Sequence, residues 1–328
     1  KGEVRVDGAK NSVLKLMAAS LLAEGTTTLR NCPQILDVPL MRDVLVGLGC
    51  EVEIEGDVVR IHTPAVVSPH ADFDAVRQFR ASVAVLGPLV ARCTEAYVAL
   101  PGGDAIGSRP LDMHQSGLEK LGATTHIEHG AVVARAEKLT GAPITLDFPS
   151  VGATEQTLLT AVRAEGRTEL RGAATEPEIM DLIAVLQKMG AIITVQTDRT
   201  IRIEGVSEMR GYNHIALPDR NESASWASAA LATRGDIYVR GAEQRDLTAF
   251  LNTYRKIGGE FDVVDDGIRF WHAGGDLNPL VLETDVHPGF MTDWQQPLVV
   301  ALTQAKGVSI VHETVYENRF GFTDALVR

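Results

Sequence analysis

Hydrophobic and polar residues follow one pattern along this chain, and that pattern returns several times. A stretch with apolar positions at helical spacing ends at a glycine, and two stretches with alternating apolar positions follow it. The glycines that end the predicted helices recur about every 70 residues, the length of a supersecondary unit rather than of a solenoid turn. They are Gly49, Gly122, Gly190 and Gly258. Each unit is predicted to hold two helices and about four strands, so we expect an α/β protein of βαβαββ modules.

The two ends of the chain do not fill whole units. Residues 3–6 alternate like a short strand, ahead of the first predicted helix. A fifth unit begins near Pro288, and its helix-ending glycine is due near position 326, so we expect this chain to stop inside a unit of a longer protein. The pattern loses its periodicity over residues 212–218, where we place the boundary between two domains.

Composition narrows the class of protein. A length of 328 residues suits about two domains, and 45% hydrophobic residues with only 5% aromatic ones indicate aliphatic cores. A formal net charge of −12 argues against a general nucleic-acid or membrane surface, although a few cations in a cleft can still hold an anionic substrate. Cys32, Cys50 and Cys93 have no metal-like spacing and indicate a reducing compartment. No apolar run approaches the roughly 18 residues of a membrane span. We expect no signal peptide and a cytoplasmic protein.

Candidate chemistry concentrates in residues 100–114, LPGGDAIGSRPLDMH. An apolar run over 96–100 predicts a strand, and Pro-Gly-Gly then ends it in a loop. Asp104, Arg109 and Asp112 follow closely, a combination that suits proton transfer beside a bound anion. A solvated surface loop explains the local composition equally well.

Lys10 precedes an apolar pattern that predicts a helix, with Asn11 or Ser12 as its cap. A lysine at a helix N-terminus favours an anion, because free N–H groups and the helix dipole point toward it. By position alone, an ordinary surface lysine is the simpler interpretation.

Several stretches together resemble the UDP-N-acetylglucosamine 1-carboxyvinyltransferase (enolpyruvyl transferase) family, in the order found there. They are GAKNSVLKLMAASLLAEG, RQFRASVAVLGPLVAR, LPGGDAIGSRPLDMH, PSVGATE, EPEIMD, LPDR, MTDWQQP and ETVYENRF. The resemblance implies a two-domain inside-out α/β barrel of repeated βαβαββ units with pseudo-threefold symmetry and substrates in the interdomain cleft. The first domain would comprise residues 8–217 and the second residues 1–7 plus 218–328, with about one and a half of its units present.

The reaction implied by the resemblance joins phosphoenolpyruvate to the 3-hydroxyl of UDP-N-acetylglucosamine and releases phosphate, the first committed step of peptidoglycan precursor synthesis. Lys10, Arg109 and Arg319 match the family's cationic cradle, and arginine suits such anions because its donors form a fork. Asp104 stands at the position of the proton donor, and Asp293 at that of the base for the sugar hydroxyl. No cofactor and no metal ion are expected.

The resemblance also implies contacts to the sugar nucleotide. Asn11 matches a contact to the tetrahedral centre, and Val315 a backbone contact near the acetamide. The remaining matches are Arg80, Arg109, Pro110, Leu111, Asp112 and Met113 for uridine and diphosphate, and Ser150, Val151 and Gly152 for a diphosphate-binding turn at a helix start. Phe148 stands where many members carry lysine. His114, Glu176 and Glu178 are interpreted as structural.

Asp104 is the main departure from the family pattern, because most members carry cysteine there. A carboxylic acid can donate a proton, but it offers no thiolate for fosfomycin to alkylate. We therefore expect intrinsic fosfomycin resistance.

Two other functions stay open. One is the related 3-phosphoshikimate 1-carboxyvinyltransferase activity, against which the SRPLDMH stretch argues. The other is a non-catalytic homologue that binds a nucleotide sugar and regulates a partner. A regulatory protein partner of unknown identity is also left open for the enzyme itself.

Overall fold

The computed structural model describes residues 1–71 and 73–328 and divides them into two compact units. The larger unit comprises Lys10–Asp104 and Arg109–Leu217. The smaller unit comprises Lys1–Ala9, Ala105–Ser108 and Pro218–Arg328.

The larger unit is built from short strands and helices that alternate along the chain. Its strands are β2 (Gly25–Arg30), β3 (Glu51–Glu55), β4 (Val58–Thr63), β5 (Glu95–Ala99), β6 (Thr124–Glu128), β7 (Ala131–Arg135), β8 (Pro143–Thr145), β9 (Arg167–Arg171), β10 (Ile192–Val195), β11 (Ile201–Glu204) and β12 (Asn213–Ile215). Its helices are α1 (Lys10–Ala19), η1 (Ser20–Leu22), α2 (Asp37–Gly47), α3 (Phe73–Arg77), η2 (Arg80–Val85), α4 (Leu86–Cys93), α5 (Asp112–Lys120), α6 (Val151–Ala161) and α7 (Pro177–Lys188).

The sheets of the larger unit repeat one strand order, as the periodic sequence pattern predicts. One sheet runs β12-β2-β4-β3, a second runs β8-β9-β11-β10, and a third runs β5-β7-β6. In the first two, a parallel pair (β12 with β2, β8 with β9) precedes two antiparallel pairings. The third sheet keeps the two antiparallel pairings but has no parallel pair among its named strands. The repeated sequence pattern therefore produces the same antiparallel core in all three sheets.

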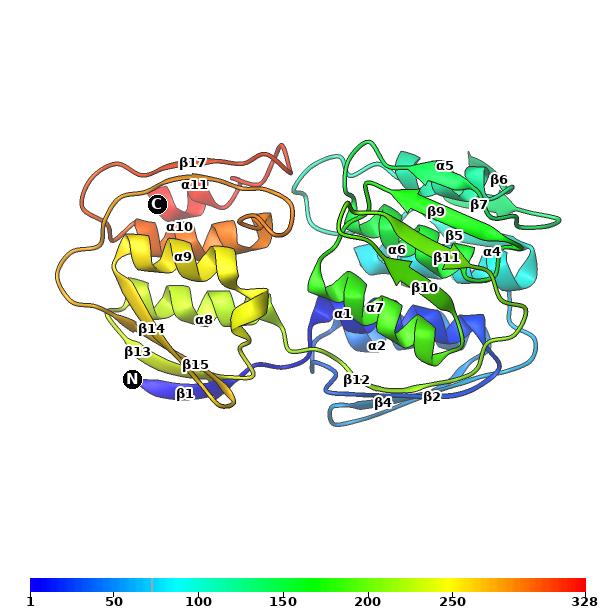
Figure 1. Ribbon diagram of the computed structural model, residues 1–328, viewed down its shortest axis with the longest axis horizontal. Helices are drawn as coiled ribbons and strands as arrows, with labels where there is room; N and C mark the ends of the chain where they lie inside the picture. Colours follow the sequence, from blue (N-terminus) through cyan, green and yellow to red (C-terminus); the bar gives the residue numbers. More distant parts are fainter. Residues whose placement is uncertain (72) are drawn as a thin grey trace. The chain divides into compact units, whose positions relative to one another are not determined.

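Helices form the interior of the larger unit, and Figure 1 shows the sheets at its outside. Helix α6 is the clearest case, because every residue from Ala153 to Ala161 is buried. In a helix that is buried on all sides, most polar side chains find their hydrogen-bond partners within the protein. Thr160, for example, donates its hydroxyl to the Gln156 carbonyl oxygen at 2.8 Å.

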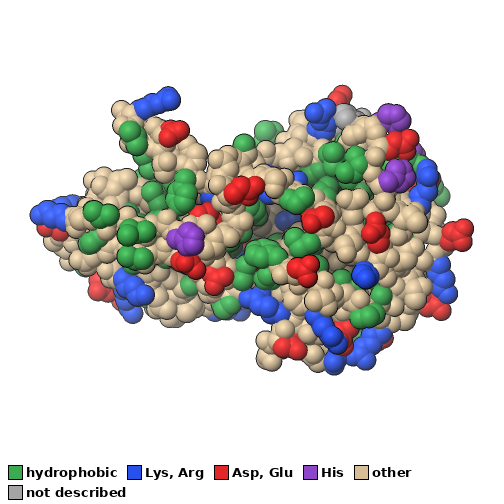
Figure 2. Space-filling view, turned by 90° about the horizontal axis from the view of Figure 1, so that it is seen from above, with side chains coloured by type: hydrophobic (Ala, Val, Ile, Leu, Met, Phe, Trp, Pro, Cys, Tyr) green, Lys and Arg blue, Asp and Glu red, His purple; other side chains and the backbone are tan. Residues whose placement is uncertain are grey.

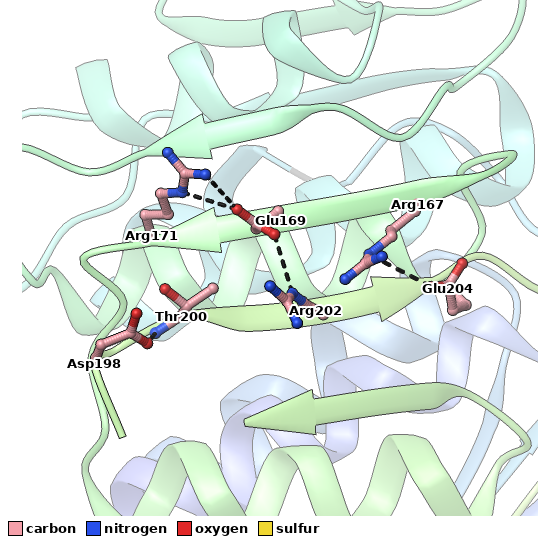
Figure 3. Close-up of polar contacts among 7 residues, drawn as sticks. All are labelled: Arg167, Glu169, Arg171, Asp198, Thr200, Arg202 and Glu204. Atoms are coloured by element: carbon pink, nitrogen blue, oxygen red, sulfur yellow. Dashed lines mark hydrogen bonds and ion pairs between the residues drawn. The ribbon is translucent and has the colours of Figure 1, made fainter. Parts of the chain in front are cut away.

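The solvent face of the β8-β9-β11-β10 sheet carries a ladder of charged side chains (Figure 3). Glu169 accepts from Arg171 Nη2 at 2.6 Å and from Arg202 Nε at 3.0 Å, and these bonds lower the pKa of its carboxyl. Arg167 pairs with Glu204 at 3.6 Å. Opposite charges facing each other across strands fit the exposed side of a sheet whose other side covers helices.

The glycines predicted to end helices are confirmed. Gly49, Gly122, Gly190 and Gly258 have φ values of 103°, 100°, 113° and 112°. This left-handed region is open to glycine and disfavoured for residues with a Cβ, so the chain can reverse there at low cost.

The smaller unit repeats the same strand order with a strand taken from the start of the chain. Strand β1 (Gly2–Arg5) pairs in parallel with β13 (Asp236–Arg240), giving the sheet β1-β13-β15-β14. The other strands are β14 (Gly259–Val264), β15 (Gly267–His272), β16 (Val281–Glu283) and β17 (Ile310–His312). Its helices are α8 (Arg220–Ala232), η3 (Gln244–Asp246), α9 (Thr248–Ile257), η4 (Thr292–Trp294), α10 (Gln295–Leu302) and α11 (Thr323–Val327).

The expectation of aliphatic cores is wrong for the smaller unit. Its buried cluster gathers Phe250, Tyr254, Phe270, Phe290 and Trp294. Tyr254 meets Phe270 edge-on at 5.4 Å between ring centroids, and Phe250 meets Trp294 edge-on at 5.7 Å. Overall composition hides this clustering, because the few aromatic residues are concentrated in one unit.

The segment expected to be an irregular boundary contains a strand. Residues 213–215 form β12, which pairs with Thr28, Leu29 and Arg30 of β2. A three-residue strand is too short for alternation to reveal it, and its pairing partner lies far back in the sequence.

The surface mixes charges of both signs, and Figure 2 shows them interspersed over the visible face. Among the described residues, no helix is both long and apolar enough to cross a membrane.

Candidate functional site

The loop from β5 to α5 folds around Arg109. Arg109 adopts φ 40° and donates from Nη2 to the Asp104 carbonyl oxygen at 2.8 Å, while Arg80 Nη2 donates to the Arg109 carbonyl oxygen at 2.5 Å. Gly103 has φ 121°, and a Cβ there would lie 2.7 Å from Arg109 Nη2. The loop thus brings two guanidinium groups and the backbone of Asp104 together, while Asp104 itself is exposed. Asp104 and Arg109, which the sequence placed close together, are therefore neighbours within one loop, joined through the backbone of Asp104.

The starts of α5 and α6 lie side by side through His114 and Gly152. A Cβ on Gly152 would lie 2.9 Å from His114 Cε1, so glycine permits this close approach. Ser150 caps α6 by accepting from the Ala153 N–H at 3.3 Å, and the predicted helix start is confirmed. Burial, reinforced by the charge of Arg80, lowers the pKa of His114 to about 4. His114 is therefore neutral near pH 7 and adds no positive charge here.

Lys10 and Asn11 lie in the first turn of α1. The helix begins at Lys10, so the expectation that Asn11 or Ser12 caps it is wrong. Lys10 is about half exposed, with Nζ 3.9 Å from Asp37 Oδ1. Lys15 Nζ donates to the Asn11 carbonyl oxygen at 2.9 Å. A lysine in the first turn of a helix adds its charge to the positive end of the dipole, which favours an anion there.

A buried acidic cluster lies behind this turn. Lys15 Nζ is 3.2 Å from Glu155 Oε1, and Glu176 and Glu178 are also buried. Burial raises the pKa of Glu155 to about 7, against the opposing pull of Lys15. The interpretation of Glu176 and Glu178 as structural residues stays a prediction.

Replacing Glu155 by glutamine should change the pH dependence of stability. A carboxyl whose folded pKa is raised from 4.5 to about 7 favours the folded state fully below its unfolded pKa. That contribution is lost as the pH rises through the folded pKa. As the pH rises from about 4 to about 8, the free energy of unfolding of wild type should therefore fall by about 3 kcal/mol relative to that of Glu155→Gln. Denaturant unfolding at each pH provides the measurement. Glu51→Gln, on exposed β3, is the control; equal pH profiles for wild type and Glu155→Gln contradict the prediction.

Asp293 and Arg319 meet in the smaller unit. Asp293 lies in η4, and its Oδ1 accepts from Arg319 Nη2 at 2.8 Å, with side-chain exposures of 30% and 11%. Arg319 also contacts Gln296 Oε1 at 3.4 Å and lies over the ring of Tyr316. Asn221 Nδ2 donates to Asp293 Oδ2 at 3.3 Å, so both carboxylate oxygens are engaged. The arrangement holds a carboxylate and a guanidinium in fixed orientation at a partly open position.

Glu313 fixes the segment that carries Val315. Its Oε1 accepts from the Val315 and Tyr316 N–H groups at 2.9 and 3.2 Å, and its Oε2 accepts from Thr292 Oγ1 at 2.9 Å. Sequence reasoning missed Glu313 and Asn221 as partners of the site. Glu313 opens the stretch ETVYENRF, which was the available signal, whereas no pattern pointed to Asn221.

The tip of the 100–111 loop, Ala105–Ser108, is grouped with the smaller unit. Glu317 Oε1 accepts from the Ser108 N–H at 2.7 Å, a bond that lowers the pKa of Glu317. Asn318 donates from Nδ2 to the Ala105 carbonyl oxygen at 2.8 Å. Glycine suits position 107 because its φ is 155°, and a Cβ would lie 2.5 Å from Glu317 Oε2, so the Glu317 side chain would have to move. The turn that carries Arg319 thus also holds this tip.

The expected site residues therefore fall into two sets, one in each unit. The smaller unit holds Asp293, Val315 and Arg319, with the carboxylate and guanidinium paired. The larger unit holds Lys10, Asn11, Arg80, Asp104, Arg109, Pro110, Leu111, Asp112, Met113, Ser150, Val151 and Gly152. Asp112 opens α5, where its negative charge suits the helix dipole.

Comparison with known sequences gives matches along the whole chain. Residues 1–328 match the model of the family described as EPSP synthase (3-phosphoshikimate 1-carboxyvinyltransferase). A UDP-N-acetylglucosamine 1-carboxyvinyltransferase of Corynebacterium efficiens is 57% identical over 333 residues, covering 100% of this chain and 78% of the relative. One from Chlamydia abortus is 47% identical over 330 residues, covering 99% of this chain and 74% of the relative.

Solved structures share the fold. The enolpyruvyl transferase NikO from Streptomyces tendae aligns with a TM-score of 0.90 at 24% identity, over 100% of this chain and 78% of that one. An EPSP synthase from Acinetobacter baumannii aligns with a TM-score of 0.68 at 18% identity, over 94% of this chain and 73% of that one. At these low identities, the structural similarity shows only that this chain has the same mixed α/β fold.

Proposed function

Because this chain belongs to the UDP-N-acetylglucosamine 1-carboxyvinyltransferase family, we propose that it transfers the enolpyruvyl group of phosphoenolpyruvate to the 3-hydroxyl of UDP-N-acetylglucosamine, releasing phosphate. The chain is an enolpyruvyl transferase, and its reaction supplies a precursor of peptidoglycan. The observation that carries this conclusion is 57% identity to such an enzyme along the entire chain.

Cationic side chains would hold the two anionic groups of phosphoenolpyruvate. Lys10, Arg109 and Arg319 are assigned to this cradle because they match the family's cradle positions. The position of Lys10 at the positive end of α1 supports the assignment, and guanidinium groups suit carboxylate and phosphate because they bind them through paired donors. Their own acceptors, the Asp104 carbonyl oxygen and the Asp293 carboxylate, keep both side chains oriented.

Two carboxyl groups would divide the proton transfers. Asp293 takes the proton of the sugar 3-hydroxyl while the hydroxyl oxygen bonds to C2 of phosphoenolpyruvate. Asp104 donates a proton to C3, which becomes a methyl group. In the elimination, the Asp104 carboxylate takes back one methyl proton, the carbon–carbon double bond re-forms, and the bond from C2 to the phosphate oxygen breaks. Asp293 gives its proton to the departing phosphate, so both carboxyl groups return to their starting states. Fixed charges around that adduct would supply much of the rate enhancement.

The sugar nucleotide would be bound by residues from the loop, the starts of α5 and α6, and the turn after β17. Ser150, Val151 and Gly152 surround the N-terminus of α6, which suits a diphosphate. Arg80 adds a cation beside that helix. Asn11 would contact the tetrahedral adduct. The other proposed contacts to the sugar nucleotide are Arg109, Pro110, Leu111, Asp112, Met113, Asp293 and Val315.

The finer architecture is also part of this proposal. The repeated strand order and the buried α6 support an inside-out barrel with pseudo-threefold symmetry. The proposed domains are residues 8–217 for the first, and residues 1–7 with 218–328 for the second.

Aspartate at position 104 should make the enzyme resistant to fosfomycin. The inhibitor needs a thiolate, and burial raises the pKa of Cys32 to about 12 and also raises the pKa values of Cys50 and Cys93. Prolonged incubation of the wild type with fosfomycin should leave its activity unchanged, whereas the Asp104→Cys variant should lose activity with time under the same conditions. Covalent inactivation of the wild type, detected by mass spectrometry, would contradict the assignment.

The test of the function is phosphate release with different acceptors. Incubation with phosphoenolpyruvate and UDP-N-acetylglucosamine should release phosphate and form the enolpyruvyl ether. When shikimate 3-phosphate replaces UDP-N-acetylglucosamine, no phosphate should be released. Turnover with shikimate 3-phosphate alone would assign the chain to the related activity. Binding of the nucleotide sugar without turnover would favour the regulatory role.

A further inference from the structure

A relay of hydrogen bonds joins three elements of the larger unit that are distant in sequence. Ser12, in α1, donates from Oγ to Asp181 Oδ2 at 2.5 Å. Asp181, in α7, accepts at Oδ1 from His214 Nε2 of β12 at 2.7 Å. His214 Nδ1 lies 2.7 Å from Lys188 Nζ, at the end of α7. The relay therefore runs from the exposed Lys188 to the buried Ser12 in the first turn of α1.

The direction of each bond follows from its chemistry. An ammonium group only donates, so His214 Nδ1 must accept from Lys188. In the neutral imidazole the hydrogen is then on Nε2, which donates to Asp181. Ser12 fills the other oxygen of the same carboxylate. Every donor thus points toward Asp181, and the geometry leaves one tautomer of His214.

Burial makes this relay rigid. Ser12 is 1% exposed, and the side chains of Asp181 and His214 are each 9% exposed. Little water can compete for these bonds, and a buried carboxylate that loses a donor is strongly penalised. The three elements are consequently held in one arrangement.

The Ser–Asp–His set does not form a hydrolase triad. In such a triad the histidine lies between the nucleophile and the acid, so that it can take the proton of the serine. Here Asp181 lies between Ser12 and His214, and the Ser12 hydroxyl donates directly to the carboxylate. The burial of Ser12 also keeps it from substrates.

The relay ends in the turn of α1 that carries Lys10 and Asn11. First turns fray readily, because their N–H groups have no partners within the helix. Ser12 ties this turn to α7, and the bond from Lys15 Nζ to the Asn11 carbonyl oxygen ties it a second time. Both tethers oppose fraying at the residues assigned to the phosphoenolpyruvate site.

We propose that Ser12, Asp181 and His214 are positioning residues that hold the first turn of α1, so that Lys10 and Asn11 are in place to bind phosphoenolpyruvate and its adduct. This inference rests on the proposed function of Lys10 and Asn11. It assigns the three residues no contact with substrate.

The first test compares two buried serines. Ser12→Ala should raise KM for phosphoenolpyruvate about fivefold or more, with KM for UDP-N-acetylglucosamine changed less than about twofold, because only the α1 turn is released. Ser20→Ala is the matched control: Ser20 is also buried and donates to the Met17 carbonyl oxygen at 2.7 Å, beyond the other end of α1. Equal KM values for phosphoenolpyruvate in the two variants would overturn the proposal.

The second test uses two replacements of His214. His214→Gln keeps an N–H that can reach Asp181, whereas His214→Phe keeps the ring volume without a donor. The phenylalanine variant should show the same rise in KM, and the glutamine variant should stay near wild type. A purely structural role would predict losses in both, in step with their thermal unfolding midpoints, and that pattern would overturn the proposal.

Hydrogen exchange separates this inference from the proposed function. The amides of Leu14, Lys15 and Leu16 bond back to the first turn of α1, so their exchange reports its opening. Exchange should be faster in Ser12→Ala and His214→Phe than in Ser20→Ala, measured by NMR or mass spectrometry. If the wild-type protein shows no turnover, the proposed function fails, whatever the exchange rates are. If exchange in Ser12→Ala equals that of wild type, this inference fails while the proposed function stands.

Discussion

Asp104→Asn is expected to lower turnover by about 10²- to 10⁴-fold, the usual contribution of a positioned acid, while binding of UDP-N-acetylglucosamine is retained. The amide has nearly the shape of the carboxyl group but cannot protonate a carbon atom. The hydrogen bond that Arg109 makes is to the backbone carbonyl oxygen of residue 104, so the loop should keep its fold. Phosphate release gives the turnover, and calorimetry with the nucleotide sugar gives the affinity.

The control for this variant is Asp43→Asn, which removes an exposed carboxylate from α2 in the same unit. Its turnover should equal that of the wild type. Unchanged turnover in Asp104→Asn would remove Asp104 from the role of proton donor. A parallel loss of turnover and of nucleotide-sugar affinity would instead indicate that the loop has changed its structure.

Asp293→Asn should lower kcat by about 10²- to 10⁴-fold, since the sugar hydroxyl then lacks its base. The amide oxygen can still accept from Arg319, which donates at 2.8 Å to the native carboxylate. The orientation of Arg319 should therefore survive, and KM for phosphoenolpyruvate should change much less than kcat. Steady-state kinetics at saturating concentrations of both substrates provide the measurement.

Asp262→Asn, on exposed β14 of the smaller unit, is the matched control and should leave kcat unchanged. A large rise in KM without a loss of kcat would show that Asp293 serves to orient Arg319 rather than to accept a proton. Equal activity in Asp293→Asn and Asp262→Asn would exclude Asp293 from the chemistry.

Much of the local structure was predictable from the sequence. The helix-ending glycines and the repeated strand order depend on short-range periodicity and on φ preferences, which nearby residues express. The Asp104–Arg109 loop was also visible, because its residues are close in sequence and flanked by a strand and a helix. Asp293 and Arg319 came only from the family resemblance, and their contact came from the structure.

By itself, the sequence determined the repeating α/β units, the positions of their turns, and the acidic and cationic residues that identify the family. The tertiary structure decided which distant side chains meet: Ser12 with Asp181 and His214, and Asn221 with Asp293. It also decided that residues 213–215 complete a sheet with β2. The physical reason is that periodicity records only which face of an element is buried, whereas partners across elements are chosen by packing many elements at once.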